Sequence, residues 1–380
     1  MSQRSGHLSR AGHALNELLV AAHPVHRPES AIASPSTHRC NTLELSNPFS
    51  YASLPHEDHM QTRMLGRLWP VSALTLGGGG IGQLWGATTR EECVVTVRTA
   101  VERGVTLLDM APAYGNGEAE SVVGAAFEGQ LPAGVRVTTK HRLGTPPASE
   151  VERNILRSLE ESLTRMRLKR VDLFFLHSNI IPDGYDASAY TDRPATRWTT
   201  YVERFVPICE RLVADGRIGA WGITGIGIPE CILAALTEKA RPAAVQCITN
   251  PLDSPGELKY FAGPSRAREI IAAGTKAGTG VLGIRPVQGG ALTDALDRDL
   301  PPYHGIVKDF KRGAKFRALA RELGTSAAAL AHRYALSMEH VDTVVLGCKN
   351  RTEVLECIAA AAVGPLEPAL MARIDSAFAA

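Results

Sequence analysis

The chain has 380 residues, with 41 lysines and arginines against 39 aspartates and glutamates, a formal net charge of +2. This near balance excludes a broadly basic nucleic-acid-binding protein. No apolar run approaches the roughly 18 residues that a membrane-spanning helix needs, so we expect no nucleic-acid or membrane partner. At about 150 residues per domain the length suggests two or three domains, although α/β barrels reach 250 residues or more as one unit.

The seven cysteines are scattered, and none forms a Cys-x-x-Cys pair. This spacing favours neither a zinc site nor a thioredoxin-type site. Because several lie within apolar runs, we expect buried, reduced thiols in a cytoplasmic protein without a bound metal.

Residues 1–65 differ from the rest of the chain. They hold seven of the twelve histidines and several prolines and serines, without sustained helical or strand periodicity. No two of these histidines have the i,i+4 spacing that would suggest a metal site. The segment is predicted to be a disordered extension, or to precede a true initiation codon at Met60 or Met64.

Beyond this segment, apolar runs of strand length alternate with amphipathic segments of helix length. The predicted strands are 71–76, 105–109, 135–140, 171–177, 218–224, 243–250, 280–287 and 342–347. The predicted helices are 90–103, 118–129, 149–166, 200–215, 229–239, 264–278, 313–337, 351–361 and 367–378. Eight strands, each followed by a helix, are what a closed barrel requires. The sequence therefore predicts one α/β domain over residues 66–380, a (β/α)8 TIM barrel.

Three titratable residues, Asp109, Lys140 and His177, end three consecutive predicted strands. The carboxyl ends of barrel strands form a single mouth, where TIM-barrel enzymes carry their active sites. Tyr114 follows on the loop above the same mouth. A neighbouring ammonium stabilises a phenolate, so Lys140, fixed by Asp109, would make Tyr114 a better proton donor. His177 would orient a carbonyl oxygen, and the hydride would have to come from a cofactor.

The run GGGGIG at residues 77–82 fits the dinucleotide fingerprint Gly-x-Gly-x-x-Gly. The match is weak, because seven residues separate the run from the next predicted helix and any glycine-rich run satisfies the pattern. A Rossmann unit is therefore not favoured. We expect these glycines, including Gly78, to let the backbone pass close to a ligand at the barrel mouth.

From about residue 66 to 378 the chain resembles the aldo-keto reductase superfamily of NAD(P)H-dependent barrel oxidoreductases. The resemblance rests on LDMAPAYG at 108–115, TK at 139–140 and DLFFLH at 172–177. It implies interconversion of an aldehyde or ketone with its alcohol by a catalytic tetrad in which Tyr114 is the general acid. The tetrad is Asp109, Tyr114, Lys140 and His177.

The resemblance leaves two alternatives open. One is a sugar dehydrogenase that uses the same site, and the other is a cofactor-sensing regulatory subunit similar to potassium-channel β subunits. The expected partner is a small-molecule carbonyl compound or sugar. The oligomeric state is not predicted.

Several cofactor contacts are implied by the resemblance. Gln246 looks like the family's carboxamide-binding glutamine, and Thr224 offers a hydroxyl where many members have Ser-Asn. Arg285 stands where some members have an aromatic ring that stacks on nicotinamide, and a salt-bridged structural arginine is the alternative. Gly78 and Asp109 are further expected cofactor contacts at the mouth.

After the eighth predicted strand, a basic loop opens a helix and suits an anionic phosphate. Lys349 and Asn350 are the residues expected to bind it, and Glu356 matches the family's adenine-binding acid. Glu353 stands where several NADP-preferring members have an arginine and would repel a 2′-phosphate, whereas Lys349 or Arg351 would attract it. The balance slightly favours NADP(H) over NAD(H), with a solvated basic helix start as the alternative.

For the substrate, Trp85 in the first βα loop is expected to wall an apolar pocket beside Tyr114 and His177, or to pack under the barrel rim. Two long polar loops, 178–200 and 288–312, are expected to shape specificity.

Overall fold

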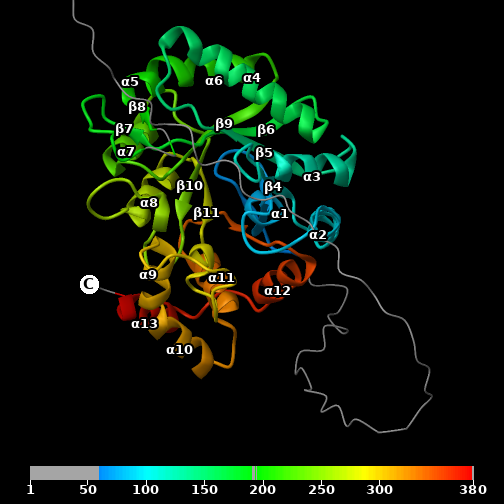
Figure 1. Ribbon diagram of the computed structural model, residues 1–380, viewed down its shortest axis with the longest axis vertical. Coiled ribbons are helices and arrows are strands. Elements are labelled where there is room, and N and C mark those ends of the chain that lie inside the picture. Colours follow the sequence, from blue (N-terminus) through cyan, green and yellow to red (C-terminus); the bar gives the residue numbers. More distant parts are fainter. Residues whose placement is uncertain (1–59, 191–192, 194, 379–380) are drawn as a thin grey trace, which may run out of the picture. The chain divides into compact units, whose positions relative to one another are not determined.

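A computed structural model describes residues 60–190, 193 and 195–378 of the chain. Eight parallel strands close into a barrel in the order β10-β11-β12-β3-β4-β5-β6-β9, with helices around it (Figure 1). The barrel strands are β3 (Leu74–Gly77), β4 (Leu107–Asp109), β5 (Arg136–His141), β6 (Val171–Leu176), β9 (Ile218–Thr224), β10 (Ala244–Ile248), β11 (Gly280–Ile284) and β12 (Thr343–Leu346). All eight lie within or overlap the predicted strands, so the predicted (β/α)8 fold is confirmed.

The helices also follow the predicted order. They are α2 (Arg90–Glu102), α3 (Glu118–Phe127), α4 (Ala148–Met166), α6 (Val206–Ala214), α7 (Pro229–Thr237), α8 (Ala267–Lys276), α10 (Ala314–Glu322), α11 (Ala327–Ser337), α12 (Arg351–Ala362) and α13 (Pro368–Phe378). The single helix predicted over 313–337 is wrong, because the chain breaks between α10 and α11. Gly324 there has a φ of +65°, and the Ser326 side chain caps α11 by accepting a hydrogen bond from the amide of Ala329.

Shorter elements lie in segments predicted as loops. They are α1 (Gly78–Ile81), the strand pair β7 (Ile180–Ile181) and β8 (Thr196–Arg197), α5 (Trp198–Thr200) and α9 (Gly305–Arg312). A π-helical turn, Tyr201–Phe205, joins α5 to α6. Elements this short give too few residues for a periodic pattern, which is why the sequence did not predict them.

Side chains of the barrel strands alternate between two apolar layers. Along β6, Leu173 and Phe175 belong to the cluster inside the barrel, whereas Phe174 and Leu176 belong to the layer between strands and helices. This alternation follows from the two-residue repeat of an extended strand. It explains why β6 reads as a continuous apolar run, since both of its faces are buried.

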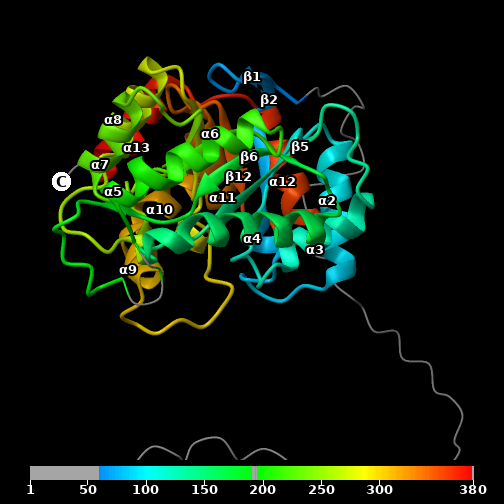
Figure 2. The same ribbon diagram turned by 90° about the horizontal axis from the view of Figure 1, so that it is seen from above.

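An antiparallel hairpin, β1 (Thr62–Met64) and β2 (Pro70–Ser72), closes the amino-terminal end of the barrel. Leu65 and Val71 pack into the cluster inside the barrel. Figure 2 shows the hairpin at the edge of the barrel opposite α9. The predicted extension therefore ends before residue 65, and the error arose because a three-residue strand is too short to detect. The other residues of the predicted extension, 1–59, lie outside the described residues, as does Cys40.

Among the described residues, no helix is both long enough and apolar enough to span a bilayer. The six cysteines in this part of the chain are all buried and free, as expected. No group of three metal-ligating side chains occurs within the same residues.

Candidate active site

A buried ion pair lies at the carboxyl ends of β4 and β5. The Nζ atom of Lys140 donates to Oδ2 of Asp109 at 2.8 Å and to the carbonyl oxygen of Met110 at 2.8 Å. The other carboxylate oxygen of Asp109 accepts from Thr138 Oγ1 at 2.7 Å and from Gln246 Nε2 at 2.9 Å. The Nζ atom and both carboxylate oxygens thus each form at least one hydrogen bond. These bonds offset part of the cost of burying the two charges.

Neighbouring groups favour the charged form of the Lys140 side chain. Burial alone would lower the pKa of its ammonium, but the charge of Asp109 and the phenol of Tyr114 outweigh burial and raise that pKa. The Nζ atom lies 4.8 Å from the centre of the Tyr114 ring. The ammonium of Lys140 therefore lies beside the phenol, where the sequence placed it.

Tyr114 and His177 lie next to each other at the mouth. Their ring centres are 5.7 Å apart with an interplanar angle of 82°, an edge-to-face arrangement. The Tyr114 amide donates to the carbonyl of Ala111 at 3.1 Å, which turns the chain after β4. A Cβ atom on Gly78 would lie only 2.7 Å from the Tyr114 ring, so a glycine is needed there.

The surroundings of His177 favour the neutral form of its imidazole. Burial first, and then the positive charges of Lys140, Arg142 and Arg193, hold its pKa well below the ordinary value. A neutral imidazole can donate one hydrogen bond to an oxygen without adding charge. Together, the phenol beside an ammonium and the neutral imidazole can hydrogen-bond one oxygen atom at this mouth.

These groups open into a cavity of about 470 Å³. The cavity runs from the loops after β4, β5 and β6 to the start of α12, and all four members of the predicted tetrad line it or lie directly beneath it. Its volume falls in the range of small-molecule sites. The sequence-predicted residues on its wall are Gly78, Trp85, Asp109, Tyr114, His177, Thr224, Gln246, Arg285, Lys349 and Glu356.

Trp85 meets both expectations made for it. A Cβ atom on Gly79 or on Gly347 would lie 2.4 Å from the indole ring, so the ring packs on the rim. The same indole lines the cavity. Trp85 therefore forms part of the cavity wall and packs against the barrel rim.

The glycine run serves the protein's own packing as well as the cavity. A Cβ atom on Gly80 would lie 2.0 Å from the carbonyl oxygen of Cys348, and one on Gly77 would lie 2.4 Å from that of Leu346. The glycine backbone does come close to another group, as expected. At these two positions, however, that group is the backbone at the end of β12 and not a ligand. A one-turn helix, α1, starts inside the run, contrary to the prediction that no helix directly follows it.

Thr224 and Gln246 are both buried on the cavity wall. Thr224 Oγ1 donates to the carbonyl of Leu176 at 3.2 Å, and Gln246 donates to Asp109. The side-chain oxygen of Gln246 accepts no hydrogen bond from the described residues and remains able to accept one from a ligand. These two side chains match the polar contacts that the sequence predicted for a carboxamide.

Arg285 is a salt-bridged arginine, the second of the two alternatives. Its guanidinium binds Glu257 with both Nη atoms, at 3.1 Å and 2.9 Å, and its Nε atom donates to Gln288 at 2.6 Å. The residue has a φ of +58°. Its orientation is therefore fixed by three hydrogen bonds on one face of the cavity.

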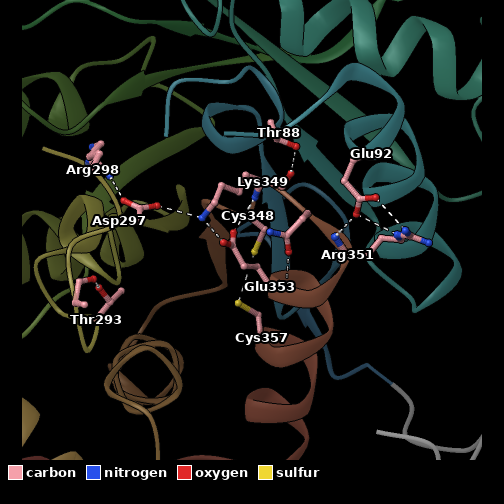
Figure 3. Close-up of polar contacts among 12 residues, drawn as sticks. Thr88, Glu92, Thr293, Asp297, Arg298, Cys348, Lys349, Arg351, Glu353 and Cys357 are labelled. Atoms are coloured by element: carbon pink, nitrogen blue, oxygen red, sulfur yellow. Dashed lines mark hydrogen bonds and ion pairs between the residues drawn. The ribbon is translucent and has the colours of Figure 1, made fainter. Parts of the chain in front are cut away.

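The start of α12 is more acidic than its sequence suggested. The ammonium of Lys349 is bound by Asp297 at 3.1 Å and by Glu353. Arg351 is held by Glu92 at 3.0 Å, on the side of the helix away from Lys349 (Figure 3). The basic side chains at the start of α12 are therefore paired with carboxylates, contrary to the expected loop of free positive charges.

Asn350 has a structural role. Its side-chain oxygen accepts a hydrogen bond of 2.9 Å from the amide of Glu353 and caps α12. It does not line the cavity, so the expectation that Asn350 contacts a phosphate is not supported by its position. A capping side chain and a phosphate ligand are both favoured at a helix start, and the sequence alone does not separate them.

Five charged residues of the cavity were not singled out from the sequence. Arg142 could have been found, since it stands two residues after Lys140 and strand side chains alternate. The other four lie in long loops, where no periodic signal indicates which side chains turn inward. They are Arg193, Glu257, Asp297 and Arg298.

Residues 73–379 match the model of the Aldo/keto reductase family. The chain is 25% identical over 296 residues to the L-galactose dehydrogenase of Arabidopsis thaliana, covering 76% of this chain and 84% of that protein. It is 33% identical over 173 residues to the aldo-keto reductase YhdN of Bacillus subtilis, covering 42% and 45%. Among solved structures it is similar to an aldo-keto reductase from Klebsiella pneumoniae in complex with NADPH. The TM-score is 0.60 at 22% identity, covering 84% of this chain and 95% of the other.

Proposed function

Because this chain is an oxidoreductase of the aldo/keto reductase family, we propose that it interconverts an aldehyde or ketone with its alcohol, with Tyr114 as general acid. The observation that carries the proposal is the placement of Lys140 Nζ, which is bonded to Asp109 and lies 4.8 Å from the centre of the Tyr114 ring at the cavity mouth. The same mouth carries the neutral imidazole of His177.

The proton transfer follows from these contacts. A carbonyl oxygen that accepts hydrogen bonds from Tyr114 and His177 is polarised and fixed. As its carbon becomes saturated, the oxygen gains negative charge and takes the phenol proton. The ammonium of Lys140 stabilises the phenolate left on Tyr114, and Asp109 keeps that ammonium charged and in place. In the reverse direction the phenolate accepts the alcohol proton.

The residues on the cavity wall fit a nicotinamide dinucleotide. Gln246 and Thr224 would hold the carboxamide, and Lys349 and Glu356 at the other end would face the adenosine phosphate and the adenine. Gly77, Gly78 and Gly79 line the wall between these two ends. The bound cofactor supplies the hydride, which no side chain can deliver.

The slight preference for NADP(H) over NAD(H) is part of this proposal. Lys349 supports it by charge, and the Klebsiella pneumoniae relative binds NADPH. Asp297 and Glu353, which both bind Lys349, act against it because they offset the positive charge. The two coenzymes therefore have to be compared directly by titration.

Sugar oxidation is the second candidate, favoured by the similarity to L-galactose dehydrogenase. The same site supports it, because a general acid in one direction is a general base in the other. A cofactor-sensing regulatory subunit, the third candidate, predicts tight retention of NADPH with slow turnover. We place the protein in the cytoplasm, in keeping with the free, buried thiols of the described residues.

The test is Tyr114→Phe, assayed for reduction of aldehydes and ketones and for oxidation of sugars. We expect turnover to fall at least about 100-fold, while the dissociation constants for NADPH and NADH stay within about twofold of wild type. Tyr303→Phe, which alters an exposed tyrosine, is the matched control and should keep wild-type rates. Wild-type turnover by Tyr114→Phe would contradict the assignment of the acid.

A further inference from the structure

The cavity wall beside Tyr114 and His177 carries a guanidinium that the proposed proton transfer does not use. Arg142 is the first residue after His141, the end of β5, and lines the cavity together with the phenol and the imidazole. In the closed barrel β5 lies between β4 and β6. Arg142 therefore stands between the two loops that carry Tyr114 and His177.

Arg142 has no carboxylate partner within the described part of the chain, where it forms no hydrogen bond or ion pair. After burial, the largest effect on the pKa of its guanidinium comes from a group of the same sign. Burial by its neighbours and the positive charge of Arg193 both lower the pKa of the Arg142 guanidinium. Arg193 lines the same cavity. Arg142 is exposed and Arg193 is half-buried, so two like charges share the open side of the cavity, and an anion bound there would offset their mutual repulsion.

The other charges at this end of the cavity are neutralised. Arg285 is bound by Glu257 at 2.9 Å, and Asp109 is bound by Lys140 at 2.8 Å. Against the effect of burial, the charges of Arg285 and then of Arg193 lower the pKa of the Glu257 carboxyl group, so Glu257 faces both of these cations. Arg142 is thus the cation on this part of the wall without a carboxylate partner among the described residues. A guanidinium presents two parallel N–H groups that match the two oxygens of a carboxylate or phosphate.

We propose that the carbonyl substrate carries an anionic oxygen group, a carboxylate or a phosphate, and that Arg142, with Arg193 beside it, binds that group. The carbonyl oxygen then lies against Tyr114 and His177, so the inference rests on the proposed function. Arg142 becomes a specificity residue, because its charge selects acidic carbonyl compounds over neutral compounds of the same shape.

Two aldehydes of matching shape isolate the charge. 4-Carboxybenzaldehyde and 4-nitrobenzaldehyde each carry a planar group with two oxygens opposite the aldehyde, and only the first is an anion. We measure the ratio of their kcat/KM values with NADPH as the coenzyme. This ratio should fall about 10- to 100-fold in Arg142→Gln, the usual effect of losing a hydrogen-bonded charge partner. Arg142→Lys, which keeps the charge and loses the paired N–H groups, should give an intermediate ratio.

The control variant is Arg204→Gln. Arg204 is an exposed arginine in the π-helical turn, outside the cavity. It should leave the ratio at the wild-type value. An equal fall in Arg204→Gln and Arg142→Gln would mean that the overall charge of the protein is responsible, and would overturn the proposal. A parallel comparison of glyceraldehyde 3-phosphate with glyceraldehyde shows whether phosphate or carboxylate is the preferred anion.

Binding without turnover separates this inference from the proposed function. Benzoate is titrated calorimetrically into Tyr114→Phe and into Tyr114→Phe/Arg142→Gln, each saturated with NADPH. Weaker benzoate binding in the double variant, by about 10-fold or more, supports the anion site even if the wild type reduces neither aldehyde. Equal binding by the two variants, or a turnover ratio unaffected by Arg142→Gln, overturns it while leaving carbonyl reduction standing.

Discussion

The Nζ atom of Lys140 lies 2.8 Å from Oδ2 of Asp109, and both side chains are buried below the mouth of the barrel. The pair joins β4 to β5 at the point where the proposed chemistry takes place. It also explains how charged groups can be buried there, since each member offsets part of the cost of burying the other. The ion pair is therefore part of both the site and the stability of the fold.

Removing one member of this pair should destabilise the protein. Lys140→Met leaves the Asp109 carboxylate buried without its cation, and Asp109→Asn leaves the ammonium without its anion. Each change should lower the free energy of unfolding in urea by about 3–5 kcal/mol. The double variant should lose less than the sum of the two, because it leaves no unpaired charge. Strict additivity of the two losses would show that the pair is not coupled.

Two histidines near the mouth should make the protein less stable in acid. Burial first, and then nearby positive charge, hold the pKa of His177 well below its ordinary value and lower that of His141 to about 4. Between these values and about 6.5, the unfolded chain binds protons that the folded chain does not. The free energy of unfolding should therefore fall as the pH falls below about 6.5, by up to about 1.4 kcal/mol per pH unit for each histidine.

Urea unfolding at several pH values between 4.5 and 7.5 measures this slope. His141→Gln should reduce the slope of the free energy of unfolding against pH by the contribution of one histidine. His340→Gln removes an exposed histidine and serves as the control, with a wild-type slope expected. A slope that His141→Gln leaves unchanged would mean that another group causes the loss of stability.

The sequence predicted the fold and the centre of the site for a physical reason. Parallel barrel strands are buried on both faces, so each reads as an apolar run that ends abruptly. The polar residues at those ends, Asp109, Lys140 and His177, were therefore visible, and barrel geometry places successive strand ends at one mouth. Tyr114 was found because it follows Asp109 closely in the chain.

The contacts between loops could not be predicted in the same way. Asp297 binds Lys349 at 3.1 Å although 52 residues separate them in the chain, and neither lies in a periodic segment. Asn350 matched both a phosphate ligand and a helix cap, and only the structure shows it capping α12. The sequence indicates where a helix starts. It does not show which acidic side chains pair with the basic residues there.

Glu353 should set the coenzyme preference. Its carboxylate binds the ammonium of Lys349, the cation expected to face a 2′-phosphate. Glu353→Gln removes the negative charge and leaves Lys349 with Asp297 alone. We expect the ratio of the NADH to the NADPH dissociation constant to rise about 5- to 30-fold, the effect of one charged contact of about 1–2 kcal/mol.

Fluorescence titration of both coenzymes measures this ratio. Glu92→Gln is the matched control, because it removes a carboxylate from Arg351 outside the cavity. The control should leave the ratio within about twofold of wild type. If Glu353→Gln lowers the affinity for both coenzymes equally, the residue acts on the structure of α12 and not on the 2′-phosphate.

Cys357 should be the most reactive of the described cysteines. Its Sγ atom lies 3.7 Å from that of Cys348 and 3.6 Å from His332 Nε2. The hydrogen bond from Cys348 and the positive charge of His332 lower the pKa of the Cys357 thiol despite its burial. The thiolate is the nucleophilic form, so iodoacetamide at pH 6 should alkylate Cys357 first.

Peptide mass spectrometry after timed alkylation supplies both the measurement and its internal controls. Burial raises the pKa of the Cys209 and Cys247 thiols, and neither lines the cavity, so both should stay unmodified. Cys348→Ala removes the hydrogen bond and should slow alkylation of Cys357 at pH 6. Because Cys357 lines the proposed adenosine end of the cavity, saturating NADPH should protect it. Alkylation at an unchanged rate with NADPH bound would place the coenzyme elsewhere, whatever the reactivity of the thiol.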